Sequence, residues 1–294
     1  MDVKELMAKV GRIRILTNRL IDDQLAGDYH SSFKGQGVEF DEVRPYEAGD
    51  DVRTIDWNVT ARTGIPYIKR YSEERELTIL FLVDVSGSQS YGSRSKTKAE
   101  LAAEVTALLA LTAIRNQDKV GLVLFSDRIV KHIPPRRGRN SVMRLAREVL
   151  AASEDACGGT DIAGALQFLE GVQKRKAVVF LVSDFLQPPG AYEKLLRAAA
   201  RRHDVICLPV GDPAEFDLPD AGLVELEDPE TGDLVLVDTA SRRVREEFAA
   251  KAAADREELA RFFLRSRIET LPLSTDRPYI DDVRALFKRR ARKR

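Results

Sequence analysis

The stretch LTILFLVDVSGS, residues 77–88, decides the predicted fold. Residues 77–85 are almost all apolar or β-branched, a pattern typical of a strand that is buried on both faces of a sheet. A polar turn, Ser86-Gly87-Ser88, follows at once. The stretch therefore predicts a central strand of a parallel sheet that ends in a polar loop.

Strand and helix patterns alternate along the rest of the chain. Apolar runs predict the strands, and Ala-rich or amphipathic stretches between them predict the helices. Such alternation is typical of an α/β fold with a doubly wound, mostly parallel sheet and helices on both faces. The strands are expected at 119–125, 128–133 (an antiparallel edge), 177–182, 205–210 and 268–273, and the helices at 96–114, 140–152, 161–173, 190–202, 239–266 and 278–290.

We predict two parts in the chain. Residues 1–75 form an N-terminal part, with a helix over 1–27 followed by a loop-rich segment with short strands. Residues 76–294 form the α/β domain, with a hairpin insertion near 223–237 that the Pro-Glu-Thr-Gly-Asp turn at 229–233 indicates.

The composition excludes several classes of protein. The 294 residues include 47 basic and 47 acidic side chains, whereas a bulk nucleic-acid binder is usually strongly basic. The two cysteines, Cys157 and Cys207, form neither a disulfide framework nor a paired zinc knuckle. The longest apolar stretch, residues 101–114, is too short to span a bilayer, and residues 1–25 do not resemble a signal peptide. We therefore expect a cytoplasmic protein without a transmembrane segment.

The chain ends in a basic run, residues 288–294. A charge run of this kind is usually a solvated, frayed helix end. The other interpretation is a weak contact with an acidic partner or an anionic membrane surface. The run comprises Lys288, Arg289, Arg290, Arg292, Lys293 and Arg294.

Polar side chains follow two of the buried strands and open one helix. Asp84, Ser86 and Ser88 follow the first strand, Asp184 follows the strand at 177–182, and Thr160 precedes a helix. Ligands of open α/β sheets bind beyond the carboxyl ends of the strands, so we expect these loops to converge. Hydroxyl and carboxylate oxygens are the ligands that Mg²⁺ prefers, and Mn²⁺ accepts them too.

The residue types indicate a division of roles at this site. We expect the hydroxyls of Ser86, Ser88 and Thr160 to contact the ion, and Asp84 and Asp184 to hold metal-bound waters. Neutral hydroxyl ligands leave the charge of the cation poorly cancelled, so a partner's Asp or Glu carboxylate would be attracted to an open position. In the other interpretation, the residues after the first strand only shape a turn and cap the next helix.

The set Asp84-x-Ser86-x-Ser88, Thr160 and Asp184 resembles the metal-ion-dependent adhesion site of von Willebrand factor A domains. In that family the two serines and the threonine contact the ion, and the aspartates act directly or through water. The resemblance implies an α/β fold that binds proteins through a metal-bridged carboxylate.

A second set of motifs lies just ahead of this domain, namely Arg44-Pro45-Tyr46, Gly49-Asp50, Arg53, Ile55-Asp56-Trp57 and Ala61-Arg62. These motifs resemble those of a bacterial family catalogued as domain of unknown function 58, and the two resemblances together cover about residues 33–290. Members of that family resemble partners of MoxR-type AAA+ ATPases in chaperone-like assembly or activation of other proteins, and many carry membrane segments that this chain lacks.

This second set of residues has a structural and a functional interpretation. In the structural one, Tyr46 and Trp57 anchor the segment, and the arginines pair with Asp50 and Asp56, because charged residues are rarely buried unless paired. In the functional one, the segment binds the ATPase or a client. The candidate interaction residues are Arg44, Tyr46, Asp50, Arg53, Trp57 and Arg62.

Two other phosphate-handling folds do not match the sequence. A phosphate-binding ATPase loop needs Lys after its second glycine, and Gly87 and Gly92 have the correct separation, but Ser93 follows. A phosphatase of the haloacid dehalogenase type needs a second Asp two residues after the first, and Ser86 stands there.

The sequence therefore predicts a metal-dependent protein–protein interaction module, not an enzyme. Its expected partner supplies an Asp or Glu carboxylate and is a MoxR-type ATPase or its client, with no nucleic acid involved. One alternative is a magnesium-dependent hydrolase that uses the same site, although His30, His132 and His203 are scattered and provide no evident base. Another is a scaffold that binds no metal.

Overall fold

The computed structural model describes residues 3–33, 39–72, 76–154, 158–227 and 232–292. Residues 1–32 and 77–294 form one compact unit, and residues 33–76 form a second, smaller one. The sequence had grouped the N-terminal helix with the loop-rich segment. The structure groups it with the α/β unit, where Leu25 and Tyr29 are buried and the Tyr29 hydroxyl donates a 2.7 Å hydrogen bond to Asp118.

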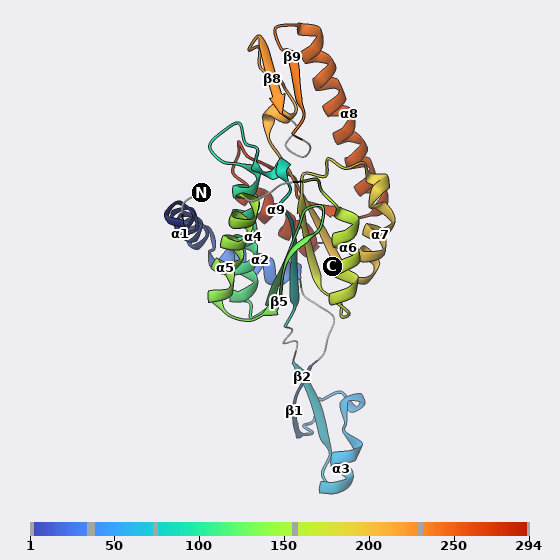
Figure 1. Ribbon diagram of the computed structural model, residues 1–294. Coiled ribbons are helices and arrows are strands. Elements are labelled where there is room, and N and C mark those ends of the chain that lie inside the picture. The colour runs from blue at the N-terminus through green and yellow to red at the C-terminus, as the bar shows by residue number, and fades with distance from the viewer. Residues whose placement is uncertain (1–2, 34–38, 73–75, 155–157, 228–231, 293–294) are drawn as a thin grey trace. The chain divides into compact units, whose positions relative to one another are not determined.

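A mostly parallel sheet forms the centre of the larger unit (Figure 1). Its strand order is β10-β7-β6-β3-β4-β5, with β11 also paired to β7. The pair β4–β5 is antiparallel, and the other pairs are parallel. The predicted fold class and the antiparallel edge strand are thus confirmed. The strands are β3 (Thr78–Asp84), β4 (Lys119–Phe125), β5 (Ile129–Arg136), β6 (Val178–Ser183), β7 (Asp204–Gly211), β10 (Glu269–Thr270) and β11 (Leu273–Ser274).

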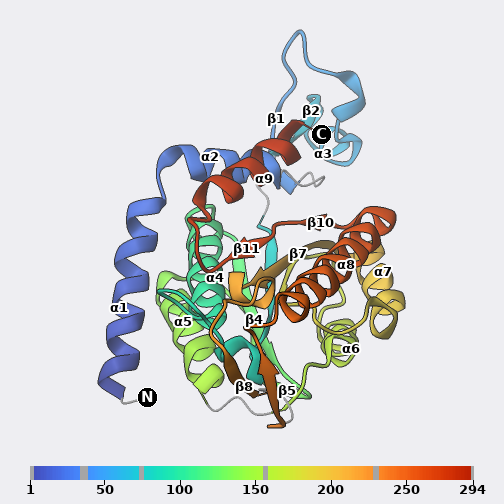
Figure 2. The ribbon, with the colours of Figure 1, turned by 90° about the horizontal axis from the view of Figure 1, so that it is seen from above.

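Helices cover both faces of this sheet (Figure 2). On one face α4 and α5 pack together, with α1 against them and α2 against α4 and α9, while α6, α7 and α8 cover the other face. The helices are α1 (Val3–Leu20), α2 (Asp23–Ser32), α4 (Lys98–Arg115), α5 (Arg139–Glu154), α6 (Ile162–Val172), α7 (Glu193–Arg202), α8 (Arg242–Ser266) and α9 (Ile280–Arg292), with short 3₁₀ turns η2 (Gly87–Ser90), η3 (Pro189–Ala191) and η4 (Pro213–Glu215).

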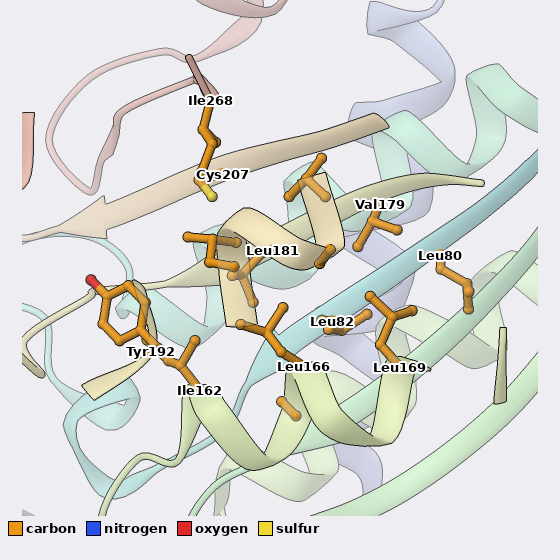
Figure 3. Close-up of a cluster of buried hydrophobic side chains, with 14 of the residues drawn as sticks. Leu80, Leu82, Ile162, Leu166, Leu169, Val179, Leu181, Tyr192, Cys207 and Ile268 are labelled. Carbon is orange, nitrogen blue, oxygen red and sulfur yellow. The ribbon is translucent and has the colours of Figure 1, made fainter. Parts of the chain in front are cut away.

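One buried cluster holds α6, α7 and the end of α8 to the sheet (Figure 3). Side chains alternate between the two faces of a strand, so every second residue of β3, β4, β6 and β7 points to these helices. Leu82 and Leu181 come from the strands, Leu166 from α6 and Phe262 from α8. The cluster thus fixes the strand ends from which the candidate site is built.

Three elements depart from the predicted pattern for identifiable reasons. The helix expected over 1–27 breaks after Leu20, where the Asp22 carboxylate accepts the Leu25 backbone N–H and starts α2. The strand expected over 268–273 is split into β10 and β11 around Pro272, which has no N–H for the ladder. In the basic tail, Arg290 is buried and pairs with Asp204 and Glu269, so this residue is structural and not solvated.

The predicted insertion near 223–237 is an antiparallel hairpin of β8 (Leu223–Glu227) and β9 (Leu234–Asp238). It forms a two-stranded sheet of its own, apart from the central sheet. Residues 228–231, which include part of the predicted turn, lie outside the described residues.

The smaller unit, described from 39 to 72, contains an antiparallel pair of strands, β1 (Glu39–Pro45) and β2 (Tyr67–Ser72). Between them lie η1 (Val52–Thr54) and a short helix, α3 (Trp57–Thr63). The sequence predicted loops and short strands here but missed α3. The Asp56 carboxylate caps this helix, and Gly64 ends it at φ 73°.

Two further sequence predictions concern membranes and thiols. None of the helices in the described part of the chain is both long and apolar enough to cross a bilayer. Cys207 lies buried in β7, where burial raises the pKa of its thiol, and Cys157 lies outside the described residues.

Gly121 of β4 should be essential for the packing of β5. A Cβ atom there would lie 2.9 Å from the backbone O of Ile133, the backbone N of Pro135 and a methyl carbon of Leu80. We expect Gly121→Ala to lower the free energy of unfolding by about 1–3 kcal/mol in urea denaturation. Gly171→Ala, in open space at the end of α6, is the control and should be neutral or slightly stabilising. Equal stability of the two variants would contradict this packing.

Candidate metal centre

The five predicted site residues meet at the carboxyl end of the sheet. Asp84 ends β3, Ser86 caps and Ser88 lies within η2, Thr160 precedes α6, and Asp184 follows β6. Strands β3 and β6 are neighbours, but the chain leaves β3 toward α4 on one face and β6 toward α7 on the other. This divergence is the topological switch point where open α/β sheets bind ligands.

Backbone hydrogen bonds join the loop before α6 to the loops that follow β3 and β4. The Gly87 N–H donates to the Gly158 carbonyl at 3.3 Å, and the Asp161 N–H donates to the Ser126 carbonyl at 2.7 Å. Gly158 has φ 97°, a conformation that L side chains rarely adopt, and a Cβ there would lie 3.3 Å from the Asp127 carboxylate. The loop that carries Thr160 is thus held against the loop that follows β3.

Three buried hydroxyls form the centre of the site. The Oγ atoms of Ser86 and Ser88 are 3.2 Å apart, and Thr160 Oγ1 is 2.9 Å from Ser86 Oγ. Mg²⁺ binds oxygen at about 2.1 Å in octahedral geometry, so oxygens at adjacent corners are about 3.0 Å apart. The two distances therefore fit an ion with Ser86 Oγ at a corner adjacent to each of the other two oxygens.

The carboxyl group of Asp84 is hydrogen-bonded to the residues around these hydroxyls. Its Oδ2 accepts from the Ser183 hydroxyl at 2.6 Å and from Thr160 Oγ1 at 3.3 Å, and its Oδ1 accepts from the Ser86 N–H at 3.0 Å. Burial, and secondarily the charge of Asp184, raise the pKa of Asp84 from 3.8 to about 7, against the hydrogen bonds from Ser183 and Ser86, which lower it. A nearby cation would favour the ionised form of this carboxyl.

Asp184 is bound by a lysine that the sequence did not single out. Its Oδ2 accepts from Ser88 Oγ at 2.6 Å, Gln89 Nε2 at 3.0 Å and Lys98 Nζ at 2.8 Å. The Lys98 side chain is fully buried, and its ammonium also contacts Glu215. Burial alone would lower the pKa of Lys98, but the two carboxylates outweigh that effect and raise it above its usual value.

Glu215 connects this lysine to the loop after β7. Its Oε2 accepts from the Asp212 N–H at 2.8 Å, and Asp212 is itself bound by Thr275 Oγ1 at 2.5 Å and by the Ser93 backbone N–H at 2.9 Å. Burial would raise the pKa of Asp212, but these hydrogen bonds lower it, so its carboxylate form is favoured. The ends of β6, β7 and β11 are thereby joined to the beginning of α4.

The formal charges of this cluster leave room for a dication. The Lys98 ammonium contacts two carboxyl groups, on Asp184 and Glu215, and a third, on Asp84, is bound by Ser183 and Thr160. When all three are ionised, the excess is two negative charges, which one divalent cation would balance. Within the described ranges no group of three or more His, Cys, Asp or Glu is placed to hold a metal.

The sequence missed Ser183, Gln89 and Lys98. Ser183 adjoins a predicted residue and ends a buried strand, which is a weak signal. Lys98 gave a stronger signal. A cation in the first turn of an apolar helix is disfavoured by the helix dipole, so it needs an anionic partner. Its partner Glu215 is 117 residues away in the chain, so local pattern alone could not identify the pair.

The second set of candidates lies in the smaller unit. Arg44 Nη2 contacts Asp50 Oδ1 at 2.7 Å, as the predicted charge pairing requires. Tyr46 is half-buried, whereas Arg53 and Arg62 are exposed. Trp57 was expected to anchor the segment, but 69% of its surface is exposed, because it begins α3 on the solvent side. Whether Trp57 anchors this segment on the larger unit stays a prediction.

A family model described as "Protein of unknown function DUF58" matches residues 42–258, a range that includes every loop of the candidate site. The "Uncharacterized protein Rv1480" of Mycobacterium tuberculosis is 32% identical over 283 residues, which cover 96% of this chain and 89% of that protein. A similar "Uncharacterized protein MAV169" of Mycobacterium avium is 35% identical over 161 residues, covering 54% of this chain and 94% of that protein.

Solved structures show more distant similarity. One is the conserved hypothetical protein BatB from Bacteroides thetaiotaomicron, with a TM-score of 0.48 and 17% identity over 74% of this chain and 99% of that one. Another is a von Willebrand factor type A protein from Catenulispora acidiphila, with a TM-score of 0.40 and 13% identity over 77% of this chain and 45% of that one. None of these similarities assigns the chain a ligand, a partner or an activity.

Removal of the buried ammonium should strongly destabilise the fold. In Lys98→Met, Asp184 and Glu215 lose the charge between them, and breaking a buried pair costs about 3–5 kcal/mol. We expect a loss of this size in urea denaturation without divalent cations. Lys131→Met removes a more exposed partner of Glu148 and should cost only about 0–1 kcal/mol. If both variants lost the same small amount, Lys98 would not be what stabilises the carboxylates.

Proposed function

The chain belongs to the DUF58 family, and we propose that it is a metal-dependent protein-binding module in which Ser86, Ser88 and Thr160 hold Mg²⁺. One observation carries the proposal: three buried hydroxyl oxygens are spaced at 2.9 and 3.2 Å, beside carboxyl groups in excess of the positive charge. Mn²⁺ shares the octahedral preference for oxygen and is the natural substitute.

The donor set favours capture of a carboxylate. Hydroxyl ligands are neutral, and Asp184 is already bound by Ser88, Gln89 and Lys98, which favours an indirect role through metal-bound water. The ion would keep most of its charge for an incoming ligand, and an Asp or Glu of a partner provides the hard oxygen that Mg²⁺ prefers.

The surface next to the site suits a protein partner. Leu186, two residues after Asp184, is 64% exposed, and Tyr91 directly after η2 is 43% exposed. Such side chains would give apolar contacts around a metal-bound carboxylate, as the core of an interface usually does.

Binding is preferred over catalysis because the histidines, the most frequent general bases, lie elsewhere. His30 is on α2, His132 packs on Phe168, and His203 Nδ1 accepts the Ala177 backbone N–H at 3.3 Å. None of the three is among the contacts of the hydroxyls. We therefore assign no catalytic residue.

For the partner, the proposal follows the family resemblance. A MoxR-type AAA+ ATPase, or a client that it assembles or activates, would supply the carboxylate in the cytoplasm. The segment with the Arg44–Asp50 pair and exposed Trp57 is a candidate second contact with that partner. The exposed residues of the basic tail, Lys288, Arg289 and Arg292, are candidates for a weak contact with an anionic membrane surface.

Metal dependence is tested by removal of the hydroxyls. Mg²⁺ that binds the native state should raise the melting temperature of the wild type. At a Mg²⁺ concentration of 100 times Kd, the free energy of unfolding should rise by about 2.7 kcal/mol. Ser86→Ala/Ser88→Ala should fold and show at most a tenth of the Mg²⁺ affinity. Ser90→Ala is the control, because its hydroxyl lies in the same turn but donates to the Ser153 carbonyl.

A second arm measures partner binding. Calorimetry with a purified MoxR-type ATPase from the same cell should show binding in Mg²⁺ that EDTA or the double substitution abolishes. An equal Mg²⁺ shift in wild type and double variant would refute the metal site. Partner binding that is unchanged in EDTA would refute its role in recognition.

A further inference from the structure

The β8–β9 hairpin presents an unusual solvent-exposed face. In an antiparallel pair, residues directly opposite each other share a face of the sheet. The register pairs Leu223 with Asp238, Glu225 with Leu236, and Glu227 with Leu234, so each pair combines one leucine with one carboxylate. We call this set of six residues the Leu–acid face.

All six side chains of this face are exposed. The leucines expose 69%, 60% and 66% of their surface at positions 223, 234 and 236. Leu234 and Leu236 are successive on the same side of β9, and Leu223 is the diagonal neighbour of Leu236, so the three are contiguous. On the opposite face Val224 and Val237 are half-buried, whereas Leu226 and Val235, nearer the tip, are exposed, so the Leu–acid face is the more exposed of the two.

The segment that carries the hairpin is acidic, and the nearest cations along the chain are Arg242, Arg243 and Arg245 at the start of α8, of which Arg245 pairs with Asp220. Residues 212–239 contain ten Asp or Glu residues and no Lys, Arg or His. The hairpin follows β7, and in Figure 1 it lies beyond the end of the central sheet, beside no strand of that sheet. Contiguous apolar side chains at such a position mark a binding surface more often than chance exposure.

We propose that the Leu–acid face is a docking surface for a second protein that presents basic and apolar side chains. Charge complementarity favours such a partner. The leucines would pack on its apolar side chains, and Glu225, Glu227 and Asp238 would pair with its basic side chains. An anionic lipid surface would be repelled by the same carboxylates. The surface is independent of the proposed metal site, with which it shares no residue.

A designed peptide tests this docking chemistry directly. Three repeats of Leu-Ser-Lys-Ser place Leu and Lys on the same side of an extended chain. Fluorescence anisotropy in EDTA should show binding to the full-length protein that weakens as salt is added. Peptides with Glu in place of Lys, or Ala in place of Leu, should bind at least about tenfold more weakly.

Two variants assign this binding to the hairpin. Leu234→Ser/Leu236→Ser should reduce the affinity about tenfold or more, whereas Leu264→Ser, at an 80% exposed position of α8, should not change it. Glu225→Gln/Glu227→Gln keeps the leucines and the strand, and it should weaken binding and flatten its salt dependence. If the leucine substitutions disturb the hairpin, the Glu→Gln variant still tests whether the peptide binds there.

Three outcomes would overturn the proposal. The first is equal binding of the Lys and Glu peptides, and the second is binding that neither hairpin variant alters. The third is a wild-type dimer in light scattering that the leucine variant dissociates, which would make a second copy of this chain the occupant. Because the assay contains EDTA, failure of the metal-site proposal leaves these results unchanged.

Discussion

Burial of like charges at the carboxyl end of the sheet is the constraint on which this structure depends. Asp84 and Asp184 end or follow neighbouring strands, and Glu215 approaches from the loop after β7. The cost of such burial is lowered by hydrogen bonds from Ser183, Ser88 and Gln89 and by the Lys98 ammonium. The residual negative charge is what makes a divalent cation a plausible ligand in electrostatic terms.

The fold delivers this cluster because β3 and β6 are adjacent although they are about a hundred residues apart in the chain. Their side chains above and below the sheet are apolar, and their packing holds the two strands in place. The hydroxyls of the loops after β3 and before α6 then converge at the switch point. The site itself is buried, and the exposed large hydrophobic side chains closest to it in the chain are Leu186 and Tyr91.

Much of the fold followed from periodicity, because buried parallel strands such as residues 77–85 have a strong local signature. The DUF58 family was also recognisable from short motifs. What failed depended on contacts distant in sequence or on single residues: the break at Asp22, the interruption by Pro272 and the burial of Arg290. The five site residues could be predicted from the sequence because each ends or follows a strand or precedes a helix at the same edge of the sheet. The contact of Lys98 with Asp184 could not, because it depends on which loops meet in the folded protein. Whether the five site residues bind a metal remains a prediction.

The most direct test of the central claim is anomalous scattering from crystals of the protein grown or soaked in Mn²⁺. The account predicts one strong peak at the end of β3, within about 2.1–2.3 Å of the side-chain oxygens of Ser86, Ser88 and Thr160. Asp184 should lie farther away, still in contact with Lys98. No peak at that position, at Mn²⁺ concentrations that raise the melting temperature, would contradict the assignment.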